Sequence, residues 1–139
     1  NGMGFWIKSP LNSAGTNVIT FMGEAVDSAT QTVNIVSGLQ MRCYVFSSPI
    51  GIQETHYYQD GATTNASYTL ADQIIVWTGS SYQPYGLKGS GLWYPCKNAA
   101  QWLGQPASNT LDVSQGFWYT ARKPFVSTET NRYLGNLRN

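Results

Sequence analysis

Short β-type segments separated by turn residues are the feature that most limits the folds open to this chain. Val, Ile, Thr, Tyr, Phe and Trp are concentrated in short runs between clusters of Gly, Ser, Asn, Asp and Pro. No stretch sustains an apolar period of about 3.6 residues over about 11 residues, and the best helical stretch, 98–103, ends at Gly104. We predict strands at 4–8, 17–22, 31–36, 39–47, 73–78, 81–86, 91–94, 109–113, 116–121 and 130–134. The pattern predicts an all-β fold, an antiparallel β-sandwich or barrel of short strands with little or no helix.

In two segments the side chains can be assigned to two faces by the period-two alternation of a strand. Within 39–46, Leu39, Met41, Cys43 and Val45 share one face. Segment 73–78 is apolar on both faces, as in a strand buried between two layers, so we predict that Trp77 lies in the core. The same reasoning places Trp118 in the core.

Turn chemistry predicts two hairpins and one long loop. Gly79 and Gly38 can each take a positive φ, and we expect each to join a pair of strands. Residues 48–70 are polar and lack periodicity, and a loop of about 20 residues in a compact domain is usually functional or mobile. Residues 84–108 form a second irregular region that carries aromatic side chains among Gly and Pro.

One element occurs twice in the chain. Gly4-Phe5-Trp6-Ile7 matches Gly116-Phe117-Trp118-Tyr119, and the same register aligns Phe21, Met22 and Gly23 with a second aromatic-Gly segment at 133–135. We therefore divide the chain into a strand pair at 1–27, which duplicates the C-terminal element, and a β domain at 28–139. The duplicated pair is a candidate donor strand for a neighbouring subunit, with Gly4, Phe5, Trp6, Ile7, Phe21, Met22 and Gly23 as the assembly residues.

Composition excludes several classes of partner. Charged residues make up 11% of the chain and the formal net charge is +1, with no basic stripe to neutralise phosphates, so we expect no nucleic-acid partner. No apolar run approaches the length of a membrane span. A start without Met, together with few Lys and Glu and many Thr, Ser, Asn, Gly and Tyr, favours a processed protein exported to the cell surface or the extracellular space.

Cys43 and Cys96 are the only cysteines. With one His and no CxxC motif, the sequence offers no zinc site. Two buried thiols are one interpretation. In an oxidising compartment a disulfide between Cys43 and Cys96 is the interpretation that we favour.

No catalytic motif is present, and we predict that the chain is not an enzyme. His56 is the only histidine, and no Gly-x-Ser-x-Gly motif accompanies it. Paired carboxylates would have to come from Glu24, Asp27, Glu54, Asp60, Asp72, Asp112 and Glu129. For the aspartates that lie beside predicted strands, hydrogen bonding within turns is the simpler explanation. No phosphate loop or calcium loop is present, so no cofactor or metal is expected.

Aromatic side chains are the remaining means of binding a ligand. Tyr and Trp are also ordinary β-sheet and core residues. The candidate ligand or contact aromatics of the irregular region are Tyr82, Tyr85, Trp93, Tyr94 and Trp102.

Several motifs carry a family resemblance. They are Val36-Ser37-Gly38-Leu39, Phe46-Ser47-Ser48-Pro49, Asp72-Gln73-Ile74-Ile75-Val76-Trp77, Gly91-Leu92-Trp93-Tyr94, Gly116-Phe117-Trp118-Tyr119 and Tyr133-Leu134-Gly135. Together they resemble uncharacterised, exported β-rich repeat proteins, chiefly of planctomycete and verrucomicrobial bacteria. The chain departs from that group at Gln40-Met41-Arg42, where the corresponding strand is usually more apolar. The resemblance implies export and a repeated β architecture, and it brings no catalytic residue.

These observations support two hypotheses. The first is a structural subunit of an extracellular or cell-surface fibre, which joins copies of itself head to tail by strand addition. The alternative within that hypothesis is a monomer in which both copies of the element pair internally. The second is a carbohydrate-binding or adhesive β module that uses the loop aromatics.

Overall fold

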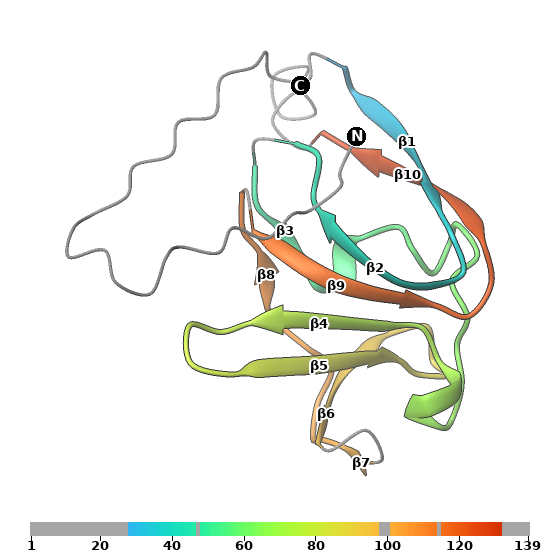
Figure 1. The fold of residues 1–139 in the computed structure, drawn as a ribbon, viewed down its shortest axis with the longest axis vertical. Helices are drawn as coiled ribbons and strands as arrows, with labels where there is room; N and C mark the ends of the chain where they lie inside the picture. Colours follow the sequence, from blue (N-terminus) through green and yellow to red (C-terminus); the bar gives the residue numbers. More distant parts are fainter. Residues whose placement is uncertain (1–27, 47, 98–100, 114, 132–139) are drawn as a thin grey trace, which may run out of the picture.

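The computed structural model describes residues 28–46, 48–97, 101–113 and 115–131. Within these ranges the chain forms strands and two 3₁₀ turns and contains no α-helix, so the all-β prediction is confirmed (Figure 1). Every pairing between the strands is antiparallel, and the sheets do not close into a barrel. The elements are β1 (Thr30–Ile35), β2 (Gly38–Cys43), β3 (Ile50–Gly51), η1 (Ile52–Glu54), η2 (Tyr68–Leu70), β4 (Gln73–Trp77), β5 (Tyr82–Leu87), β6 (Trp93–Lys97), β7 (Gln101–Trp102), β8 (Thr110–Leu111), β9 (Gly116–Ala121) and β10 (Phe125–Thr130).

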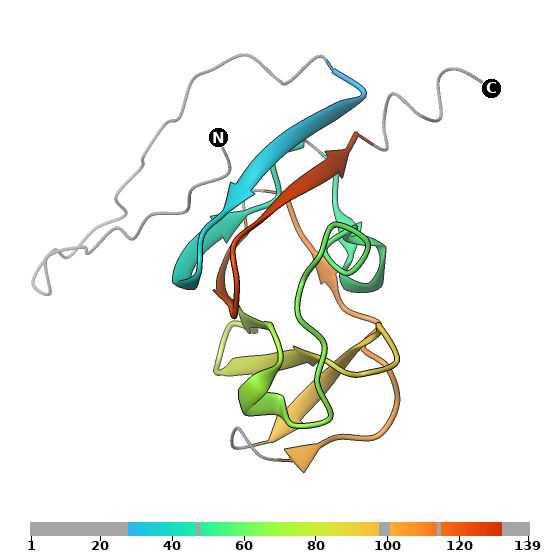
Figure 2. The same cartoon turned by 90° about the vertical axis from the view of Figure 1, so that its right-hand side faces the viewer.

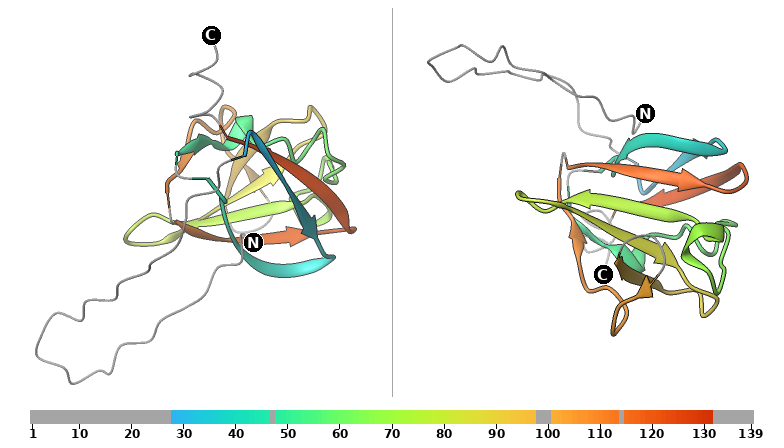
Figure 3. Two further views of the ribbon diagram at one scale, coloured as in Figure 1. Left: turned by 90° about the horizontal axis from the view of Figure 1, so that it is seen from above. Right: turned by 60° about the horizontal axis from the view of Figure 1, so that its bottom comes forward.

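A bent two-stranded ribbon connects two of the sheets. β1 pairs with β10, and β2 pairs with β9, so residues 30–43 run antiparallel to residues 116–130 along almost their whole length. Both segments of the ribbon turn a corner at the same place, one between β1 and β2 and the other between β9 and β10 (Figure 3, left). Gly38 has a φ of +99°, a conformation that side chains with a Cβ rarely adopt. The predicted hairpin at residues 36–39 is therefore wrong, because β1 and β2 each pair with a C-terminal strand and not with each other.

The β2–β9 half of this ribbon belongs to a six-stranded sheet, in the order β2-β9-β4-β5-β6-β7 (Figures 1 and 2). The predicted hairpin between β4 and β5 is confirmed, and Gly79 at its turn has a φ of +94°. Thr78 stabilises the turn, since its Oγ1 donates a hydrogen bond of 2.9 Å to the carbonyl of Ser81. A third, two-stranded sheet of β3 and β8 lies to one side.

The core lies between the inner face of the six-stranded sheet and the two-stranded β1–β10 sheet. Strand alternation directs Ile74 and Val76 of β4, and Phe117 and Tyr119 of β9, to this inner face. Val33, Ile35, Tyr44, Phe46, Ile50, Ile52, Tyr57, Ala62, Tyr85, Leu87, Trp93, Ala107, Leu111 and Ala121 complete the buried cluster. At about 25 cal/mol for each Å² of apolar surface removed from water, burial of these side chains is the main stabilising contribution.

The segment 48–70 packs on the core. Ile52, Tyr57 and Tyr68 are buried, and Gln53 donates hydrogen bonds from Nε2 to the carbonyls of Trp93 (2.7 Å) and Ala107 (2.9 Å). The sequence predicted a polar loop because these anchors are spaced without periodicity. They nevertheless anchor this segment to the core.

Three other predictions require correction. Strand β10 lies at Phe125–Thr130, where the sequence predicted no strand before residue 130, and residues 132–134 of the strand predicted at 130–134 lie outside the described residues. Residues 101 and 102 of the predicted helical stretch form the short strand β7. Trp77, predicted to be core, is 44% exposed, and Trp118 is half-buried. The predicted strands at 4–8 and 17–22 lie outside the described residues.

Candidate functional site

The outer face of the six-stranded sheet is apolar and accessible. Residues that alternate with the core positions point to this face, and those of β2, β9 and β4 and of the first half of β5 are exposed or half-buried. They are Leu39, Met41, Cys43, Gln73, Ile75, Trp77, Tyr82, Pro84, Trp118 and Thr120, and none of them is charged. Contiguous apolar patches of this kind commonly mark interaction surfaces.

A groove of about 470 Å³ crosses this face over β4, β5 and β6. Its lining residues are Tyr68, Ile75, Tyr82, Gln83, Pro84, Cys96, Lys97 and Leu103. At its rim Trp77 and Tyr82 form an edge-to-face pair with ring centroids 4.9 Å apart, and both rings are nearly half exposed. The groove thus combines aromatic surface with one lysine, a combination suited to an amphipathic ligand.

An aromatic cluster borders the groove on the side of β7. Trp102 lies edge-to-face against Tyr68 and Tyr94, and its indole Nε1 donates a hydrogen bond of 2.7 Å to the carbonyl of Ala66. Gly86 lies beneath two of these rings, where an added Cβ would come within 2.6 Å of Tyr68 and 2.9 Å of Trp102. The ammonium of Lys88 lies 4.7 Å from the ring centre of Tyr94 and 5.8 Å from that of Trp102.

The first strand of the six-stranded sheet, β2, is an edge strand of the described part of the fold. β2 pairs with β9 on one side, and among the described residues no strand pairs with its other side. Leu39 of this strand is 63% exposed. An edge strand presents backbone N–H and C=O groups to which a further strand can bind.

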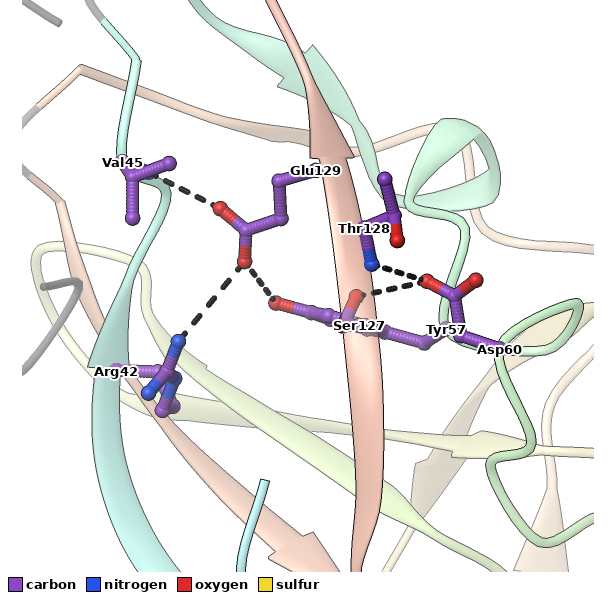
Figure 4. A network of polar contacts seen from close by, with 7 residues as sticks. All are labelled: Arg42, Val45, Tyr57, Asp60, Ser127, Thr128 and Glu129. Atoms are coloured by element: carbon purple, nitrogen blue, oxygen red, sulfur yellow. Dashed lines mark hydrogen bonds and ion pairs between the residues drawn. The ribbon is translucent and has the colours of Figure 1, made fainter. Parts of the chain in front are cut away.

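A buried polar network joins β2, β10 and the segment 48–70 (Figure 4). Arg42 Nη2 lies 3.9 Å from Glu129 Oε1, which also accepts a hydrogen bond of 3.3 Å from the Tyr57 hydroxyl. Glu129 Oε2 accepts a hydrogen bond of 3.2 Å from the backbone N–H of Val45. Burial raises the pKa of Glu129, against the opposing effects of the Val45 N–H, Arg42 and Tyr57. Within the described ranges, Arg42 Nε and Nη2 have no hydrogen-bond acceptor.

Two further carboxylates bind backbone and hydroxyl groups. Asp60 Oδ2 accepts hydrogen bonds from Ser127 Oγ (2.9 Å) and from the backbone N–H of Thr128 (2.7 Å). Asp72 is fully buried beside Tyr119, and burial raises its pKa. Both carboxylates hold structural elements together, and Asp72 is out of reach of a substrate in solvent.

Cys43 and Cys96 do not form the predicted disulfide. Cys43 lies on β2 and Cys96 on β6, with β9, β4 and β5 between them. Four strand spacings place the two residues roughly 19 Å apart, whereas a disulfide needs Cα atoms within about 7 Å. Burial raises the pKa of the Cys96 thiol to about 11, so this group is an inert part of the groove floor.

The structure divides the predicted ligand aromatics into two groups. Tyr82 is 46% exposed at the groove, and Tyr94 and Trp102 are half-buried in the adjoining cluster. Tyr85 and Trp93 are buried in the core and cannot form a ligand surface, because strand alternation directs both to the inner face. The sequence missed Trp77, Lys97 and Lys88. Their positions follow from the pairing of β4 with β5 and of β5 with β6, which the sequence does not specify. The predicted assembly residues Gly4, Phe5, Trp6, Ile7, Phe21, Met22 and Gly23 lie outside the described residues.

A second groove, of about 460 Å³, lies beside the β3–β8 pair. It is lined by Pro49, Gly51, Ile52, Gln53, Glu54, Ala107, Ser108, Asn109 and Thr110. Gln53 is committed to structural hydrogen bonds, and Glu54 Oε2 accepts one of 2.9 Å from the backbone N–H of Gly51. These residues serve to stabilise the turn into η1.

Comparisons with protein-family models, with curated proteins and with solved structures found no match. In the described part of the chain, no helix is long and apolar enough to span a membrane. Over the same residues, no group of three or more His, Cys, Asp or Glu side chains could hold a metal ion. The resemblance to exported β-repeat proteins therefore stays a prediction from sequence motifs.

Proposed function

We propose that this chain is a structural subunit of an extracellular or cell-surface assembly, in which copies join head to tail by strand addition. One observation carries the proposal. The edge strand β2 pairs on one side with β9, and the Gly-Phe-Trp sequence that begins β9 recurs at residues 4–6. Strand β2 therefore already accepts a strand of this sequence type on one side.

The pattern of the duplicated segment is compatible with addition at this edge. In β9, Phe117 and Tyr119 point to the core and Trp118 points to the outer face. By the sequence register, Phe5 and Ile7 would occupy core-facing positions and Trp6 an outer position. The outer face of β2 carries Leu39 and Met41, which would lie next to Trp6.

A strand donated by one copy to the next makes a heterologous contact. Such a contact uses two different surfaces of the subunit, and a series of them forms a filament unless the rotation closes into a ring. Backbone hydrogen bonds would supply affinity, and the alternating side chains would set the register. Export, which composition and the family resemblance favour, would place the assembly outside the cell.

The test uses the full chain and two variants of the duplicated segment. Phe5→Asp/Ile7→Asp places charge at both core-facing positions, and Lys8→Asp places the same residue type at an outer position. We expect the unmodified chain and Lys8→Asp to form filaments in negative-stain images and large species in analytical ultracentrifugation. We expect the double variant to remain a monomer. A monomeric unmodified chain at high concentration would contradict the proposal and favour internal pairing, and so would a double variant that assembles as well as Lys8→Asp.

A further inference from the structure

The groove on the outer face is distinct from the β2 edge, and its lining is amphipathic. Ile75 and Pro84 face each other across β4 and β5 and form part of the floor. Tyr82 begins β5 and Lys97 ends β6, so antiparallel pairing brings both to the end of the groove next to the β4–β5 turn. One aromatic residue and one lysine therefore line this end of the groove.

The charge around the groove has one sign. Lys97 lines it, and Lys88 lies over the adjoining rings of Tyr94 and Trp102. None of the described carboxylates contributes to the lining. Charge complementarity favours a ligand that carries anionic groups.

The exposed aromatic surface favours a ligand that contains a ring with an apolar face. Trp77 and Tyr82 are nearly half exposed although they contact each other, so one side of the pair is open to a ligand. A sugar ring has a face of C–H groups that can cover an aromatic ring, and a uronic acid adds a carboxylate at the edge of that ring. The groove volume of about 470 Å³ lies within the usual range for ligand sites.

We propose that this groove binds a polysaccharide rich in uronic acids, with one sugar ring stacked on Tyr82 and its carboxylate paired with Lys97. The two lysines select the anionic chain, and the Trp77–Tyr82 pair supplies the contact area. This site is independent of strand addition, because none of its lining residues belongs to β2.

The test measures binding to the full chain through tryptophan fluorescence, since the Trp77 ring lies 4.9 Å from the Tyr82 ring. The probes are tetragalacturonate and tetramannuronate, with fully methyl-esterified tetragalacturonate as the uncharged control. We expect saturable quenching by at least one uronate probe, weaker binding of the ester, and loss of affinity with added salt. The Phe5→Asp/Ile7→Asp variant should bind as the unmodified chain does, which separates this outcome from that of the assembly test.

Two substitutions examine the residues involved. Tyr82→Ala should lower the affinity about tenfold or more, because stacking supplies most of the contact, and Lys97→Gln should lower it about three- to fivefold, as expected for an exposed ion pair. The matched controls are Tyr58→Ala and Lys123→Gln, which alter exposed residues outside the groove lining. Near-ultraviolet circular dichroism checks that each variant is folded. The proposal would be overturned if neither uronate bound saturably, or if the methyl ester bound as tightly as the uronates. It would also be overturned if the control substitutions lowered the affinity as much as Tyr82→Ala and Lys97→Gln do.

Discussion

The hydroxyl of Tyr119 donates a hydrogen bond of 2.9 Å to Asp72 Oδ2, and both side chains are completely buried. Asp72 immediately precedes β4, and its other oxygen accepts a hydrogen bond of 2.8 Å from the backbone N–H of Arg122. Arg122 follows β9, at the corner where the chain turns toward β10. The carboxylate of Asp72 therefore fixes the corner that carries the ribbon from one sheet to the other.

The first prediction concerns this hydrogen bond. Tyr119→Phe should lower the free energy of unfolding by about 1–3 kcal/mol, because it leaves a buried carboxylate oxygen without its donor. The measurement is urea-induced unfolding, with Tyr58→Phe as an exposed control that should change stability little. Equal stability of the two variants would show that Tyr119 does not stabilise Asp72.

The second prediction concerns pH. Burial raises the pKa of Glu129 above its ordinary value of 4.5, so the folded state binds a proton more readily than the unfolded state does. The stabilisation from this proton is complete below the unfolded pKa and is lost as pH rises through the folded pKa. Glu129→Gln mimics the neutral form, so its stability relative to the unmodified chain should increase as pH rises from about 4.

Urea unfolding of both proteins between about pH 4 and pH 7 tests this prediction. Asp72, whose pKa is also raised by burial, is present in both proteins and so cancels in the difference. A stability difference that does not vary with pH would mean that Glu129 has the same pKa in the folded and unfolded states.

The third prediction concerns close packing at Gly86. Gly86→Ala would place a Cβ 2.6 Å from Tyr68 and 2.9 Å from Trp102, and overpacking of this kind typically costs about 1–3 kcal/mol. Gly89→Ala is the matched control, because its added Cβ meets nothing within 4 Å. Thermal unfolding should show a lower Tm for the Gly86 variant only. Equal Tm values would mean that the ring cluster can move without cost.

The fourth prediction concerns the cysteines. After unfolding in denaturant without reductant, both thiols should react with a chromogenic disulfide reagent, because Cys43 and Cys96 are not bridged. In the folded protein near pH 8, Cys96 should react far more slowly than in the unfolded chain, since it is buried and its pKa is about 11. Fewer than two reactive thiols in freshly purified, denatured protein would contradict the strand order.

The sequence predicted local structure best where strand alternation involves only apolar side chains. Strand β9 has the predicted limits, because Phe117 and Tyr119 alternate with residues of the outer face. Strand β10 was missed, because its core-facing residues include Ser127 and Glu129. A glutamate is buried at this position only because Arg42, Tyr57 and the Val45 N–H surround it, and those residues are distant in the sequence.

Properties that depend on which strands are neighbours could not be predicted. Trp77 lies in an apolar strand, yet it is exposed because it points to the uncovered face beside Tyr82. Tyr85 and Trp93 lie among Gly and Pro residues, yet they are buried because their strands present them to the core. The cysteine pairing failed for the same reason, since local sequence cannot reveal that three strands separate β2 from β6.

The most direct test of strand addition is hydrogen–deuterium exchange of the β2 backbone amides, Gly38–Cys43, at several protein concentrations. If a neighbouring copy donates the strand, protection of these amides should increase with concentration in the unmodified chain and should not increase in Phe5→Asp/Ile7→Asp. Amides of the central strand β4 should be protected equally in all samples, because β4 is paired on both sides. Protection of β2 that is independent of concentration and equal in both proteins would contradict donation between copies.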